Sequence, residues 1–141
     1  MKRRHRAPRG FTLMELMMAV VVVAILAAVA YPVYTEALRK GWRAEARTAL
    51  MQEMQQQERF HTQRATYSAT PFRSDSGLGS GGGKYTLAVG TCAGQADTRH
   101  CIRLTATLRR GFVDPAVQAL WLDSRGEKGC TGTVSPAGCW P

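Results

Sequence analysis

The chain of 141 residues contains no asparagine, only three histidines and no pair of cysteines at C-x-x-C spacing. Without asparagine there is no N-linked glycosylation sequon, although the serines remain open to O-linked sugars. The histidines, at positions 5, 61 and 100, are far apart. The sequence therefore contains no recognisable motif for a zinc site or for a catalytic nucleophile with its base. We predict no metal, no cofactor and no catalytic activity.

Charged residues are absent from residues 16–34, within the run GFTLMELMMAVVVVAILAAVAYPVY at residues 10–34. At ~1.5 Å per residue, a helix over this run nearly spans a bilayer core of ~30 Å. One acid, Glu15, lies near its start, and a carboxylate in hydrocarbon costs at least ~2.5–3.5 kcal/mol unless it is paired. Glu15 can reach toward the headgroups, or it can pair with a cation that processing or a neighbouring subunit supplies.

The ten residues before this run, MKRRHRAPRG, hold five Lys/Arg and no apolar core of their own. A secretory signal would place a small-residue cleavage site after the apolar run, and none follows here. We therefore expect the apolar segment to be retained. By the positive-inside rule the N-terminus lies in the cytoplasm, and residues after about Thr35 lie outside.

Residues 10–16, GFTLMEL, resemble the signature of the type IV prepilins. Gly10 precedes the family's cleavage site, Phe11 follows it, and Glu15 becomes the fifth residue of the mature chain. Pro32, with an aromatic at Tyr34, also matches the family's pattern. The resemblance implies cleavage between Gly10 and Phe11 by a prepilin peptidase, N-methylation of Phe11, contact with the inner-membrane assembly platform, and incorporation with other pilins into a filament.

The resemblance also suggests a partner for Glu15. Cleavage creates a cation at the Phe11 amine, and in a filament Glu15 of one subunit can pair with the Phe11 amine of a neighbour. Because an unpaired buried carboxylate is costly, this pair favours subunits assembled in register. Glycine at position 10 also has a physical reason, since a residue without a side chain lets a protease approach the backbone.

The formal charge of +9 overstates how basic the processed chain would be. Five of the 19 Lys/Arg lie in the first ten residues, and the remaining 14 stand against ten acidic residues, a net charge of +4. This balance does not demand a nucleic-acid partner.

We predict a pilin-like α+β fold, in which a long N-terminal helix packs on a small antiparallel sheet. The helix covers residues 11 to about 61; residues 11–34 form the transmembrane and assembly segment, and residues 35–62 are amphipathic. Residues 63–84 form a Gly/Ser-rich loop. Residues 85–125 form the sheet, with alternating apolar runs at 84–91, 101–109 and 117–124. Residues 126–141 form an irregular, disulfide-bounded loop.

The amphipathic half of the helix has a predicted core face and a predicted solvent face. The core face holds Trp42, Ala46, Ala49, Leu50 and Met54. The solvent face holds Arg43, Glu45, Arg47, Glu53 and the glutamines. Pro32 is expected to kink the helix or loosen a turn, and Gly41 is a second weak point.

The four cysteines can pair in three ways. All lie on the exported side, where disulfides form. We favour Cys92–Cys101, which would join two neighbouring strands, and Cys130–Cys139, which would close the C-terminal loop. Each would contribute ~2–3 kcal/mol in the chain-entropy account.

The tail ending GCW after LWLDSRGEKG resembles the minor-pilin (PilE-like) branch. The resemblance implies a subunit that helps to initiate the pilus or sits at its tip, held first in the bacterial inner membrane and its lipid, with its C-terminal domain in the periplasm, and later in the extracellular pilus. A major pilin and a type II secretion pseudopilin remain alternatives. Asp123 and Glu127 offer too few oxygen ligands for the calcium site usual in major pseudopilins.

A third alternative is a DNA receptor of an uptake pilus. Its candidate basic patch consists of Arg99, Arg103, Arg109 and Arg110. A solvated sheet face explains the same arginines equally well, and DNA binding would weaken steeply with salt.

Overall fold

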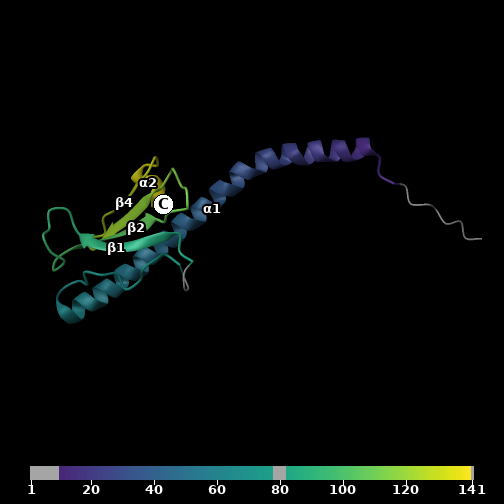
Figure 1. Cartoon of the computed structure of the whole chain (residues 1–141). Helices are drawn as coiled ribbons and strands as arrows, with labels where there is room; N and C mark the ends of the chain where they lie inside the picture. Colours follow the sequence, from purple (N-terminus) through teal and green to yellow (C-terminus); the bar gives the residue numbers. More distant parts are fainter. Residues whose placement is uncertain (1–9, 78–81, 141) are drawn as a thin grey trace, which may run out of the picture. The chain divides into compact units, whose positions relative to one another are not determined.

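The computed structural model describes residues 10–77 and 82–140, so residues 1–9 of the predicted leader lie outside the described residues. Within these ranges the elements follow in the order α1, β1, β2, β3, β4, α2 (Figure 1). The chain divides into two compact units, Met1–Ala37 and Leu38–Pro141. Helix α1 therefore contributes its first part to one unit and its second part to the other.

Helix α1 spans Leu13–Arg64, which is slightly later at both ends than the sequence predicts. It begins after Thr12, whose backbone oxygen accepts the amide of Leu16 at 3.1 Å and whose Oγ1 accepts the amide of Glu15 at 3.3 Å. Thr12 is thus an N-cap, and Thr12-x-x-Glu15 has the spacing of a capping box. The helix ends before Ala65, which has a left-handed φ of 52°.

The first unit consists mainly of the apolar part of α1. Its large apolar side chains are all strongly exposed: Phe11, Leu13, Met14, Leu16, Met17, Met18, Val20, Val21, Val22, Val23, Ile25, Leu26, Val29, Tyr31, Val33 and Tyr34. An 18-residue window reaches a mean hydropathy of 2.7 and is 0% buried, so by length and composition α1 can cross a membrane. Pro32 lies inside α1, where Thr35 Oγ1 donates to its carbonyl oxygen at 3.0 Å. The kink at Pro32 stays a prediction.

The second unit contains a four-stranded antiparallel sheet in the order β1-β2-β3-β4. Its strands are β1 (Tyr85–Thr91), β2 (Ile102–Leu108), β3 (Ala119–Asp123) and β4 (Lys128–Thr131). The first three lie in the three predicted runs, and the α+β fold class is confirmed. The predicted irregular tail is wrong, because β4 and the short helix α2 (Pro136–Cys139) form within it.

Strand β4 escaped the sequence analysis because it does not alternate apolar and polar residues. Gly129 stands at its centre, opposite Trp121 of β3. A Cβ atom at Gly129 would lie 2.6 Å from the Trp121 ring, so the indole occupies the space that a side chain would need. The strand thus depends on a glycine, the residue that usually marks a turn.

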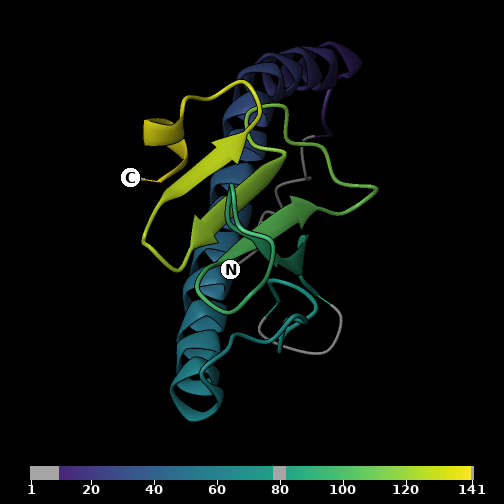
Figure 2. The same cartoon turned by 90° about the vertical axis from the view of Figure 1, so that its left-hand side faces the viewer.

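The core lies between the sheet and the part of α1 that belongs to the second unit (Figure 2). Ala46, Ala49 and Leu50 are buried, as the core face of the helix predicts. They belong to one cluster with the inward-facing strand residues Tyr85, Leu87, Ile102, Leu104, Ala106 and Leu120. Small alanines on the helix let it approach the sheet closely.

The predicted solvent face of this helix half is partly wrong. Arg43, Glu53 and Gln57 are buried, with exposed fractions of 8%, 0% and 0%. Their positions alternate in steps of three and four with Ala46 and Leu50, so the periodicity that turns those residues inward turns these inward too. The sequence analysis placed these residues in solvent because they are polar, whereas in the structure they form hydrogen bonds inside the fold.

Candidate functional site

The residues of the predicted processing site stand at the start of the described chain. Gly10 and Phe11 precede α1 and are exposed. A Cβ atom at Gly10 would meet no other atom within 4 Å. Packing among the described residues therefore does not require glycine at this position.

Glu15 lies in the first turn of α1, and its side chain is exposed. Its amide is capped by Thr12, as described above, so the backbone here is held by the chain itself. The sequence analysis considered only the charge of Glu15 and overlooked the capping pattern that includes it. Side chains around it, such as Leu16 and Met18, are exposed apolar groups. A carboxylate in such surroundings is costly in hydrocarbon unless it is paired.

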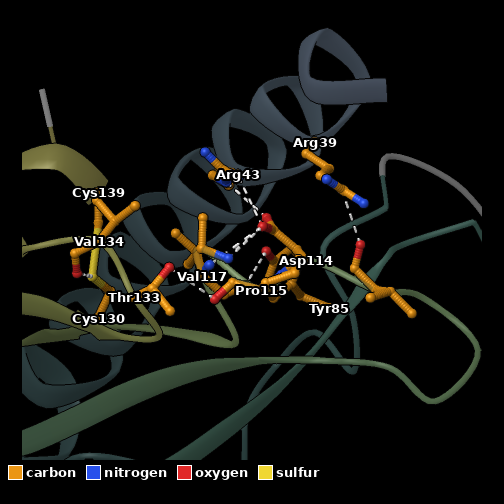
Figure 3. Close-up of polar contacts among 12 residues, drawn as sticks. Arg39, Arg43, Tyr85, Asp114, Pro115, Val117, Cys130, Thr133, Val134 and Cys139 are labelled. Carbon is orange, nitrogen blue, oxygen red and sulfur yellow. Dashed lines mark hydrogen bonds and ion pairs between the residues drawn. A yellow bond between two sulfur atoms is a disulfide. The ribbon is translucent and has the colours of Figure 1, made fainter. Parts of the chain in front are cut away.

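In the second unit, a buried ion pair ties α1 to the connection between β2 and β3 (Figure 3). Arg43 Nε and Nη2 donate to the two carboxylate oxygens of Asp114 at 2.7 and 2.8 Å. Asp114 Oδ1 also accepts the amides of Ala116 and Val117 at 3.1 and 3.3 Å. The planar guanidinium matches the carboxylate with two parallel bonds, which fixes both orientation and distance.

Tyr85 of β1 lies beside this pair and is fully buried. Its hydroxyl donates to the carbonyl oxygen of Val117 at 3.3 Å. Burial, and secondly the negative charge of Asp114, raises the pKa of Tyr85 to about 12, while Arg43 opposes the shift. The phenol is therefore kept neutral and acts as a hydrogen-bond donor inside the core.

Glu53 and Gln57 hold the loop that follows α1. Glu53 Oε1 accepts the amide of Phe72 at 2.8 Å, and Oε2 accepts the amide of Arg73 at 3.1 Å. Gln57 Oε1 accepts the amide of Ser68 at 2.9 Å. These side chains satisfy backbone donors in a loop without regular secondary structure, which explains why two polar residues are buried here.

The structure contains two disulfides, Cys92–Cys101 and Cys130–Cys139. These are the two pairings that the sequence analysis favours. The first joins the chain after β1 to the chain before β2, and the second joins β4 to α2. The C-terminal segment is also held by Arg47 Nη1, which donates to the Cys139 oxygen at 2.8 Å. Trp140 Nε1 donates to the Gly129 oxygen at 2.9 Å.

The four candidate arginines do not gather in one place. Arg99 belongs to the exposed loop before β2, whereas Arg109 and Arg110 follow the other end of that strand. Seven residues at ~3.3 Å each separate the two ends by roughly 20 Å. Arg103 lies between them, with its guanidinium carbon 4.0 Å from the centroid of the Trp121 ring.

The two acids considered for calcium have other surroundings. Asp123 Oδ1 accepts the amides of Arg125 and Glu127 at 3.0 and 2.9 Å, which closes the turn between β3 and β4. Asp123 is buried near the first disulfide, while Glu127 is exposed. Asp123 also lies within 4.8 Å of both sulfur atoms, but those sulfurs are bonded to each other. Asp123 therefore stabilises the β3–β4 hairpin.

Two known families match this chain, each over a different part of it. Residues 5–31 match the prokaryotic N-terminal methylation motif. Residues 32–116, more than half of the chain, match the family described as "Type IV minor pilin ComP, DNA uptake sequence receptor". The chain belongs to the type IV minor pilin ComP family. The prepilin resemblance of residues 10–34 is thereby confirmed, and the apolar first part of α1 fits a pilin that is anchored in the inner membrane and later joins the pilus.

One curated relative of this pilin is the type IV major pilin protein PilA of Myxococcus xanthus (strain DK1622), 33% identical over 97 residues. The alignment covers 68% of this chain and 43% of PilA, so the chain spans less than half of that relative's length.

Two solved structures are similar to this pilin. The non-core minor pilin PilV of Neisseria meningitidis has a TM-score of 0.51 and 17% identity, covering 69% of this chain and 90% of PilV. A type IV pilin of Shewanella oneidensis has a TM-score of 0.46 and 21% identity, covering 63% and 88%. The likeness to PilV supports the pilin fold.

Proposed function

We propose that this pilin is a minor structural subunit of a type IV pilus that helps to initiate the filament or sits at its tip. The observation that carries this proposal is the match of residues 32–116 to a minor-pilin family, joined to a methylation motif at residues 5–31. Its buried polar side chains support packing, since Arg43 binds the carboxylate of Asp114, and Glu53 and Asp123 accept backbone amides. The chain is a substrate of processing enzymes and has a structural role.

Processing is proposed to cut between Gly10 and Phe11 and to methylate the new Phe11 amine. A prepilin peptidase with methyltransferase activity is the partner that this step requires. The exposure of both residues and the free space around Gly10 support access by such an enzyme. Before assembly the N-terminus would lie in the cytoplasm and the second unit in the periplasm, because the basic residues precede the apolar run.

Assembly is proposed to bring Glu15 of one subunit to the Phe11 amine of another, whether major or minor pilin. Exposed apolar side chains surround Glu15 on α1, so neighbouring helices would bury both charges together. An ion pair in such surroundings is tolerated, whereas either charge alone is costly. The pair would thus favour one register of the filament.

The first test is quantitative mass spectrometry of sheared pili and inner membranes from the native host. A trace of this chain in pili, beginning at methylated Phe11, is the expected result. A dominant signal in pili would make it the major pilin. Processed chain in membranes but not in pili would indicate a secretion pseudopilin and overturn the proposal.

A second candidate function is DNA reception, which is favoured by the match to a family described as a DNA uptake sequence receptor. The side chains that support it lie near the Cys92–Cys101 loop, where Arg99 is exposed and Arg103 stacks on Trp121. Arg109 and Arg110 would have to contact a separate stretch of phosphates. Phosphate contacts predict that binding of the mature pilin to duplex DNA falls steeply as salt rises. Binding that Arg99→Gln and Arg103→Gln leave unchanged would remove this candidate.

A further inference from the structure

One end of the second unit collects exposed apolar and basic side chains. There α1 contacts the connection between β2 and β3. Arg39 Nε donates to the Val113 oxygen at 3.1 Å (Figure 3). The rings of Trp42 and Phe112 meet edge to face, with centroids 5.6 Å apart. This contact fixes the connection against the first turns that α1 contributes to the second unit.

Two basic segments are held at the same end. The amide of Arg109 donates to the Lys84 oxygen at 2.9 Å, and its Nη1 donates to the Gly83 oxygen at 3.1 Å. Lys84 Nζ lies 4.6 Å from the centroid of the Phe112 ring. The turn through Gly111, with φ of 94°, returns the chain so that the Phe112 amide donates to the Arg109 oxygen at 3.2 Å. We call this surface the basic–apolar end; it consists of Lys84, Arg109, Arg110, Phe112 and Val113.

The basic–apolar end is positively charged; Lys84 and Phe112 are half-buried, and its other three side chains are exposed. Val113 is 65% exposed, more than any other large apolar residue in the described part of the second unit. Arg109 and Arg110 are exposed too. The nearby carboxylate of Asp114 is buried and bound by Arg43, so it does not offset these cations. An exposed aliphatic side chain among cations is suited to a membrane surface, where anionic headgroups cover a hydrocarbon layer.

The chain connection limits how far the start of the second unit can lie from the apolar run. The apolar run ends at Tyr34, and the second unit begins at Leu38. However the two units are arranged, four residues can separate these points by no more than about 14 Å. Leu38 is 41% exposed, and the next residue, Arg39, binds Val113. Aromatic residues such as Tyr34 gather where hydrocarbon meets headgroups.

We propose that the basic–apolar end docks on the anionic phospholipid headgroups of the membrane that holds the pilin before assembly. This inference rests on the proposed function of a membrane-anchored subunit and adds a lipid partner for its second unit. Arg109 and Arg110 bind headgroup phosphates, and Val113 enters the layer beneath them. Lipid fits better than nucleic acid because the surface carries a strongly exposed aliphatic side chain, Val113, and the phosphates of DNA offer it no partner.

The test uses the full mature pilin in nanodiscs of phosphatidylcholine, with or without phosphatidylglycerol. A fluorescent label is attached through Val113→Cys, and its access to the neutral quencher acrylamide is measured. A label at Val22→Cys reports insertion of the apolar segment, and a label at Met51→Cys reports a site elsewhere on the second unit. We expect the label at position 113 to be protected only with phosphatidylglycerol, and high salt to remove this protection.

Arg109→Gln/Arg110→Gln is the variant that addresses the charges, and Arg59→Gln/Arg125→Gln removes the same charge from exposed sites elsewhere. The first should lower the ratio of docked to undocked pilin roughly 30-fold, or about 1 kcal/mol for each cation, and the second should leave it unchanged. Near-ultraviolet circular dichroism checks that both variants fold.

Each other result overturns the inference in a distinguishable way. Protection at position 22 with equal quenching at position 113 in both lipids would reject docking and leave the anchor intact. Quenching at position 22 would reject the membrane anchor, and with it the proposed function. Headgroup binding would be rejected if the label at position 113 were equally protected without phosphatidylglycerol and in Arg109→Gln/Arg110→Gln. Protection by duplex DNA in solution but not by phosphatidylglycerol would assign the surface to nucleic acid.

Discussion

The two halves of α1 follow opposite rules of burial. In the first half, apolar side chains such as Val22 and Leu26 are more than half exposed. In the second half, Arg43, Glu53 and Gln57 are buried while charged neighbours such as Arg59 face solvent. One continuous helix thus carries an apolar surface that the described part of the chain leaves exposed and a set of polar side chains that it buries.

This difference shows where each half obtains its stability. The second half is stabilised by its own sheet and loops, through Leu50 in the core and Arg43 and Glu53 at its edges. The first half has no such partner among the described residues, so its burial has to come from lipid or from other subunits. Changes in the first half should therefore affect assembly, and changes in the second half should affect folding.

Glu15→Ala should give the largest effect, and only on assembly. The variant should insert and be processed, yet be absent from filaments, because the Phe11 amine of a neighbour would be left without its carboxylate. Immunoblots of sheared pili and of membranes measure both steps. Glu127→Ala, at an exposed acid of the second unit, should enter pili normally. Normal incorporation of Glu15→Ala would disprove the charge pairing.

Arg43→Ala and Asp114→Ala should each lower the free energy of unfolding of the second unit by roughly 3–5 kcal/mol, because each leaves the other charge buried. The double variant should lose less than the two single losses together, which a double-mutant cycle in mild detergent measures. Arg59→Ala is the matched control on the exposed side. Full additivity would mean that the two residues act independently.

The same substitution in both halves sharpens the comparison. Leu50→Ala should lower the free energy of unfolding by roughly 2–5 kcal/mol, because it opens a cavity against the sheet. Leu26→Ala should leave it unchanged, since Leu26 is exposed outside the packed unit. Denaturation followed by near-ultraviolet circular dichroism reports both values. An equal loss in the two variants would contradict the division of roles along α1.

How much the sequence could predict also differs between the halves. The apolar run and GFTLMEL identify the first half, because composition and a local motif suffice there. The strands around Leu87, Leu104 and Leu120 are evident from alternation. Strand β4 is not, since Gly129 serves a contact with Trp121 that only the folded sheet creates.

The polar side chains of the second unit were the least predictable. Glu53 binds amides about twenty residues away, and Arg43 binds an acid 71 residues away. Such partners cannot be read from helical periodicity, which specifies a face but not what covers it. The scattered arginines show the same limit, because Arg99 and Arg109 are near in sequence and lie beyond opposite ends of β2.

Removing the C-terminal disulfide tests the segment that the sequence analysis left irregular. Cys130→Ser/Cys139→Ser should lower the free energy of unfolding by ~2–3 kcal/mol, because the unfolded chain regains the freedom of a loop of about ten residues. Protection of β4 amides from hydrogen exchange should fall further than that of β2 amides. The matched change, Cys92→Ser/Cys101→Ser, opens a disulfide loop of equal length. Its exchange effect should be confined to the adjoining ends of β1 and β2.

The smallest expected effect concerns pH and only the second unit. Folding raises the pKa of Tyr85 from 10.0 to about 12, so the folded chain favours the neutral phenol. The stabilisation is complete below pH 10 and is lost as the pH rises toward 12. Denaturation across this range should show a decline in unfolding free energy. Tyr85→Phe should reduce this decline, and Tyr31→Phe, in the apolar half, should retain it.

Part of the decline should persist in Tyr85→Phe, because burial, followed by the hydrogen bond to Glu58, also raises the pKa of Tyr67. If Tyr85→Phe declined as steeply as the unaltered pilin, the buried phenol would not be the group that titrates.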